Sequence, residues 1–222
     1  MLSPFDNLED VIRAEFFPGV DLALRRGQHI GREDGPMYDF LLDALDHLEP
    51  LYRRFGAELI HRADGYFYLL PRGDRLRRRK LSAGEMLVGQ ALALLYLDPS
   101  TLQGSGVVRR QALLERLDGL LEMRRLFEIL NPRKRKFNER IAARKIRKKV
   151  NTALQTLKQL GFVDQLDGDR LRLRPALMRF AEPVRGLEDR ARALEQLVAT
   201  GEVRLEQEDE VGDEDATEGE EQ

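Results

Sequence analysis

The chain has 222 residues, 42% of them hydrophobic and 34% charged, which predicts a soluble globular protein with one large or two small cores. It contains no cysteine, which excludes disulfides, a thiolate nucleophile and zinc or iron–sulfur sites held by sulfur. The sequence has no run of about 18 apolar residues and no secretory leader pattern, so we expect no membrane contact and a cytoplasmic location.

Charge is distributed unevenly along the chain. Residues 202–222 carry 11 acidic side chains and one basic side chain, which leaves 36 basic and 28 acidic side chains in residues 1–201, a net charge of +8. A basic body suggests a nucleic acid or an acidic protein as partner. The acidic tail has few apolar residues, so we expect it to be disordered. It could be a solubilising tail, a DNA mimic that competes for basic groups, or a strap onto a partner.

The first unit, residues 1–80, is predicted to be an N-terminal winged-helix domain. Short helices are expected near residues 8–17 and 20–26, followed by an extended piece at 28–30. One buried helix face follows, and its apolar residues are Met37, Leu41, Ala44, Leu48, Leu51 and Phe55. Pro50 should kink this helix near residues 46–49. Strands at 57–61 and 66–70 flank Asp64-Gly65, a strong hairpin signal.

The second unit, residues 81–200, repeats the order of helices followed by a hairpin. Ser82 and Glu85 form a capping box that should start a helix running to Tyr96, with Pro99 closing it. A strand is predicted at 107–108, and helices at 110–120 and 123–130. A long helix follows, and its buried face carries Ile146, Val150, Ala153, Leu157 and Leu160. A hairpin at 162–166 and 170–174 and a last helix ending near Gly201 complete the unit. The fold class is therefore mainly α with short β-hairpins: tandem winged-helix domains and a tail at 201–222.

The strongest candidate for a binding site is the basic segment 131–149. It holds ten basic side chains against one acid, Glu139: Arg133, Lys134, Arg135, Lys136, Arg140, Arg144, Lys145, Arg147, Lys148 and Lys149. Arg140, Arg144 and Lys148 should point away from the core, Lys145 and Lys149 should flank them, and Lys158 should continue the stripe. Such stripes neutralise phosphates, so DNA contact without sequence specificity is predicted. A docking face for an acidic partner and a solvated helix face are the alternatives.

Two further sets of residues are candidates for binding. Arg170, Arg172 and Arg174 alternate with leucines, so they share one face of a strand that could touch a DNA backbone or simply face solvent. Tyr66 and Tyr68 share a face opposite Phe67, and if that face is exposed it could bind an extended partner segment.

Nothing in the sequence indicates catalysis. His29, His47 and His61 lack the spacing of metal ligands. Gly104-Ser105-Gly106 lacks the Gly-Lys-Ser/Thr that completes a phosphate-binding loop. We therefore predict a protein that is not an enzyme, with no catalytic residues, no metal and no cofactor.

An ordered set of segments resembles the MukE family of bacterial condensin subunits. Residues 17–31 read Phe-Pro-Gly-Val-Asp-Leu-Ala-Leu-Arg-Arg-Gly-Gln-His-Ile-Gly, and further matches follow at residues 52–60, 65–69, 86–97 and 157–163. Pro50 and the very basic segment 133–149 depart from the family pattern, and a related MksE-like subunit fits equally.

The resemblance implies a tandem winged-helix homodimer in complex with a MukF-like kleisin and a MukB-like SMC ATPase. These partners would place the protein on the nucleoid, in chromosome condensation and segregation. Two other functions remain open from the sequence. A stand-alone winged-helix transcription regulator would bind a preferred DNA sequence, and a pure protein–protein adaptor would bind no DNA.

Overall fold

The first half of the chain folds as short helices packed on a three-stranded antiparallel sheet. The computed structural model describes residues 4–76, 79–132, 139–184 and 189–200; the acidic tail lies outside them. The elements of the first half are α1 (Leu8–Arg13), α2 (Phe17–Arg25), β1 (Ile30–Gly31), η1 (Arg32–Asp34), α3 (Pro36–Asp43), α4 (Leu45–Arg54), β2 (Ala57–Arg62) and β3 (Tyr66–Pro71). The strand order is β1-β3-β2.

The predicted single helix with a kink at Pro50 is wrong. Two helices form instead, and the break between them lies at Ala44, whose φ of −95° and ψ of 2° leave the helical range. Ala44 is fully buried, and the change of direction there lets Leu41 and Leu48 face one core. Pro50 is accommodated inside α4, where it removes one backbone donor without ending the helix.

The second half repeats the arrangement on a larger scale. Its elements are α5 (Ala83–Leu97), α6 (Pro99–Gln103), β4 (Val107–Arg109), α7 (Arg110–Leu120), α8 (Met123–Leu130), α9 (Glu139–Gln159), β5 (Val163–Gln165), β6 (Arg170–Leu173), η2 (Pro175–Val184) and α10 (Arg190–Thr200). The strand order β4-β6-β5 has the same topology as the first sheet. Each half thus runs helix, strand, helices, hairpin, which is the winged-helix order.

Local signals fix most of the boundaries in the second half. The predicted capping box is confirmed: the Ser82 backbone amide donates to the Glu85 carboxylate at 2.8 Å, and the Glu85 amide donates to the Ser82 hydroxyl at 3.3 Å. Helix α5 ends at Leu97, just before Pro99 as predicted, and Pro99 also begins α6, because proline suits the first position of a helix. The 3-10 segment η2 was not predicted.

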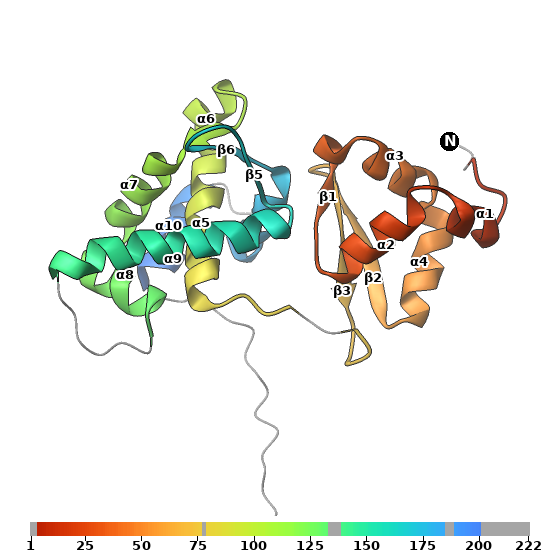
Figure 1. Ribbon diagram of the computed structural model, residues 1–222, viewed down its shortest axis with the longest axis horizontal. Helices are drawn as coiled ribbons and strands as arrows, with labels where there is room; N and C mark the ends of the chain where they lie inside the picture. The colour runs from red at the N-terminus through yellow and green to blue at the C-terminus, as the bar shows by residue number, and fades with distance from the viewer. Residues whose placement is uncertain (1–3, 77–78, 133–138, 185–188, 201–222) are drawn as a thin grey trace, which may run out of the picture.

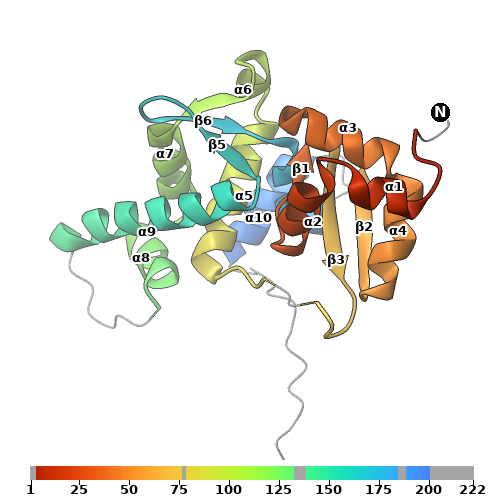
Figure 2. The same cartoon turned by 45° about the vertical axis from the view of Figure 1, so that its right-hand side comes forward.

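Two clusters of buried apolar side chains hold the fold together, one under each sheet. The long helix α5 runs through the centre of the second half, with α9 lying across it (Figure 1). A view turned by 45° shows β1 and β3 on the side of the first half that adjoins the second half, and α4 on the far side (Figure 2). The larger cluster includes Tyr66 and Tyr68 of β3, so the two halves share a packed boundary.

Candidate nucleic-acid interface

Helix α9 is amphipathic, and its burial pattern decides which of its basic side chains face solvent. Its apolar residues recur every three or four positions and pack against α5 and α8. The buried members of this face are Ala142, Ile146, Val150, Ala153, Leu154 and Leu157. The opposite face is therefore left to polar and charged residues.

The structure places the predicted basic residues of α9 as follows. Arg144, Lys148, Lys149 and Lys158 are exposed. Lys145 is half-buried, with its ammonium nitrogen 5.9 Å from the Phe127 ring centroid. A lysine in such a position packs its aliphatic stem on apolar side chains and keeps its ammonium group in solvent.

Part of the predicted basic segment cannot be placed. Arg133, Lys134, Arg135 and Lys136 lie outside the described residues, and Arg140 is placed only by its backbone in α9.

A shallow depression of about 520 Å³ runs along the exposed face of α9. We call it the basic groove. Its lining residues come from α7, α9 and β5, and they are Arg110, Arg144, Arg147, Lys148, Asn151, Thr152, Leu154, Gln155 and Gln165. Four of them are cationic and none is acidic, so the groove has an uncompensated positive charge that suits a polyanion.

Arg110 fixes one wall of the basic groove. Its guanidinium donates to the side-chain oxygens of Asn151 and Gln165, each at 3.3 Å. The start of α7, the middle of α9 and strand β5 are thereby joined. Sequence reasoning missed Arg110 because it lies far from α9 along the chain, and only the fold brings it there. Arg147 was counted in the basic segment but was not assigned to the outward stripe.

The wing arginines lie on a different surface. Arg170 and Arg172 are exposed while Leu171 and Leu173 are buried, as the alternation predicted. Gln165 pairs with Leu171, whereas Arg172 pairs with Asp164. Directly paired residues share a face, so Arg170 and Arg172 lie on the face of the second sheet opposite to Gln165 and the basic groove.

The face shared by Tyr66 and Tyr68 is buried, so the condition for partner binding there is not met. Their rings do share a face, stacked with centroids 6.1 Å apart, but Tyr66 is 0% and Tyr68 is 4% exposed. The second half covers that face: the Arg179 guanidinium carbon lies 4.1 Å from the Tyr68 ring centroid. Burying two aromatic rings between the halves removes a large apolar area from water, and it leaves no open surface for a partner segment.

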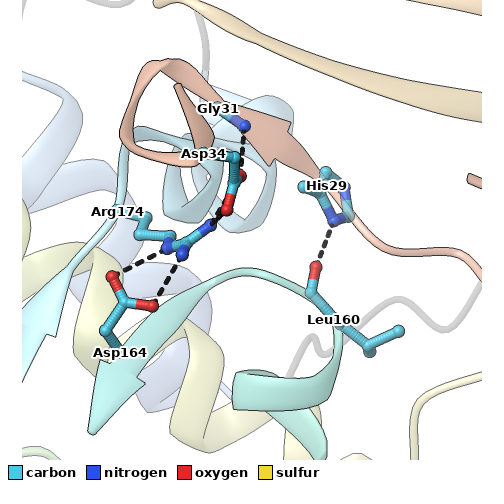
Figure 3. Close-up of polar contacts among 6 residues, drawn as sticks. All are labelled: His29, Gly31, Asp34, Leu160, Asp164 and Arg174. Atoms are coloured by element: carbon cyan, nitrogen blue, oxygen red, sulfur yellow. Dashed lines mark hydrogen bonds and ion pairs between the residues drawn. The ribbon is translucent and has the colours of Figure 1, made fainter. Parts of the chain in front are cut away.

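Polar contacts across the same boundary orient the two halves (Figure 3). Arg174, just after β6, forms ion pairs with Asp34 of η1 at 2.9 Å and with Asp164 of β5 at 2.7 Å. Asp34 also accepts the Gly31 amide at 2.9 Å. The Leu160 carbonyl, at the end of α9, accepts from His29. These contacts connect the first sheet to the C-terminal end of α9.

Burial and a nearby cation control the ionisation of this boundary. The pKa of His29 falls from 6.5 to about 3, first because burial disfavours the charged ring and second because the Arg179 guanidinium lies beside it. Burial likewise raises the pKa of the Tyr66 phenol. His29 is therefore uncharged at neutral pH.

In the described part of the chain, no three His, Asp or Glu side chains are grouped so that they could hold a metal ion. None of the described helices combines the length and the apolar composition needed to cross a bilayer.

The comparison with protein families identifies the chain. The model of the family "Condensin complex protein MksE" matches residues 15–185. The chain belongs to the MksE family. The chromosome partition protein MukE of Escherichia coli O157:H7 is 34% identical over 198 residues, covering 88% of this chain and 87% of that protein. The MukE proteins of Escherichia coli K12 and Yersinia pestis are also 34% identical over 198 residues. In each case the matched region covers 88% of this chain and 84% of the relative. The MksE match spans both winged-helix halves and includes α9.

Proposed function

We propose that this protein is a non-enzymatic accessory subunit of a bacterial condensin, and that it contacts double-stranded DNA through the basic groove. Membership of a condensin family supports the role in chromosome partition. The observation that carries the DNA contact is the set of four cations in an open groove without a carboxylate. In this proposal the subunit works on the nucleoid as a homodimer, with a MukF-like kleisin and a MukB-like SMC ATPase, and adds no chemistry of its own.

The hydrogen bonds of the basic groove favour backbone contact over base reading. The side-chain oxygens of Asn151 and Gln165 already accept from Arg110, and the Gln165 amide nitrogen is directed to main-chain carbonyls of the hairpin. Amides that read adenine need both groups free. Asn151 and Gln165 therefore do not offer both amide groups to a base, which favours contact with phosphates, and phosphates carry no sequence information.

A charge reversal tests the DNA contact. In R147E/K148E two exposed groove cations become anions, and we expect duplex affinity to fall by about 10- to 100-fold near 50 mM salt, equally for unrelated sequences. The control R26E/R53E makes the same change of charge on exposed arginines of the first half and should have a far smaller effect. Equal losses in the two variants, measured by fluorescence anisotropy, would remove the groove from the proposal.

The partner assignment has a separate test. Affinity purification of the tagged protein from native extract should recover an SMC ATPase and a kleisin. Their absence, with the protein folded and abundant, would point to a solitary DNA-binding protein, and a selection experiment would then reveal a preferred sequence.

A further inference from the structure

The basic groove and the acidic residues 202–222 are complementary in charge. We propose that this acidic segment of the same chain occupies the groove in competition with DNA and so limits the affinity of the free subunit for DNA. This inference rests on the proposed DNA contact and adds its regulation.

Within the described residues, the groove cations are available to an incoming anion. Arg144, Arg147 and Lys148 form no ion pair there, and Arg110 is held only by neutral amides. Other exposed arginines, such as Arg53 and Arg124, already pair with a glutamate one helical turn away. A ligand for the groove must therefore bring its own negative charges.

The acidic segment has the charge density that this site needs. Residues 208–215 read Glu-Asp-Glu-Val-Gly-Asp-Glu-Asp, with six carboxylates in eight positions. An extended chain rises about 3.3 Å per residue, so these charges are spaced roughly 4 to 5 Å apart on average. One strand of DNA carries a charge every 3.4 Å or so. The segment therefore resembles a single phosphate backbone in its linear charge.

The segment also starts close enough to reach the groove. It follows α10, which packs against α7 and is joined to it by the Arg116–Glu195 ion pair at 2.9 Å. At 1.5 Å per helical residue, Thr200 lies about 8 Å from Glu195, and Arg116 lies about 9 Å from Arg110 in the groove wall. Residues 201–222 can span at most roughly 75 Å, several times these distances.

Attachment to the same chain makes such competition effective. A tethered segment acts at an effective concentration in the millimolar range, so even weak ion pairing in the groove opposes DNA. When DNA displaces the segment, the freed carboxylates take up counterions again. The salt dependence of DNA binding should therefore be shallower with the acidic segment than without its charges.

The first test uses the full chain with neutralised acids. D209N/E210Q/D213N/E214Q keeps the length and removes four charges, and we expect it to bind duplex DNA about 10-fold tighter at low salt, with a steeper salt slope. The control D6N/E15Q/D74N/D118N makes the same charge change at exposed acids in the described residues. Its affinity should stay within about two-fold of the wild type, because these acids are not tethered to the groove. Equal gains in both variants would mean that net charge alone acts, which overturns the inference.

The second test measures the contact without DNA. A labelled synthetic peptide of residues 202–222 should bind the tail-neutralised chain, and R147E/K148E in that background should abolish binding while R26E/R53E should not. Unchanged DNA affinity after tail neutralisation, with a clear loss in R147E/K148E, overturns this inference and leaves the proposed function standing. If the peptide binds in the groove but the protein binds no DNA, the proposed function is overturned, while the contact between the acidic segment and the groove is supported. A peptide that fails to bind overturns the contact itself.

Discussion

The imidazole Nδ1 of His29 lies 2.8 Å from the carbonyl oxygen of Leu160, 131 positions further along the chain. A carbonyl only accepts, so Nδ1 carries the proton. Arg179 Nη1 lies 3.0 Å from Nε2, and a guanidinium only donates, so Nε2 is unprotonated. Both contacts require the neutral ring, which agrees with a pKa lowered to about 3 by burial and by Arg179.

This buried histidine predicts a loss of stability in mild acid. Between pH 6.5 and about 3 the unfolded chain protonates His29 while the folded chain does not, so the free energy of unfolding falls as pH falls. From pH 7 to pH 5 the histidine should remove about 2 kcal/mol of stability. Urea unfolding of wild type and H29N at the two pH values isolates this contribution, since asparagine can donate to Leu160 without titrating. An identical pH dependence in both proteins would contradict a neutral buried His29.

Arg174 should be a major electrostatic support of the boundary between the halves. Its side chain is 12% exposed and pairs with both Asp34 and Asp164. Removing the cation leaves two partly buried carboxylates close together, so R174A should lower the free energy of unfolding by roughly 3 kcal/mol.

Arg172 provides the matched control for this substitution. It lies two positions earlier, on β6, and is exposed, so R172A should change the free energy of unfolding by less than about 0.5 kcal/mol. Chemical denaturation followed by circular dichroism compares the two. A similar small effect from both would show that the bridge contributes nothing to stability.

Helices and hairpins were largely predictable because their signals are local. The predicted helices at 110–120 and 123–130 coincide with α7 and α8, and the strands at 57–61 and 66–70 lie within β2 and β3. Apolar periodicity, a capping box and Gly-containing turns each act over a few residues. The break at Ala44 was missed because it depends on how two helices share one core, whereas Pro50 gave the stronger local signal.

The candidate site was predictable only along α9. The outward direction of Arg144 and Lys148 follows from the helical period, since Ile146 and Val150 must face the core. The contribution of Arg110 depends on the fold, which no period reveals. The burial of Tyr66 and Tyr68 was not predictable for the same reason. Alternation shows which residues share a face, but the residues that bury this face lie near Arg179, more than 100 positions away along the chain.

Gly161 should be the glycine least tolerant of substitution, and Gly168 shows why. Both have a positive φ, 74° and 71°, so an alanine at either position costs about 1–2 kcal/mol for backbone strain. A Cβ on Gly161 would also collide with the backbone carbonyl of His29, whereas nothing lies within 4 Å of one on Gly168. Backbone atoms cannot turn aside as a side chain can, and overpacking costs a further 1–3 kcal/mol or so. We therefore expect G161A to lower the free energy of unfolding by about 3 kcal/mol or more and G168A by about 1–2 kcal/mol, measured by urea denaturation. Equal losses would mean that the first half does not approach Gly161 as closely as the structure shows.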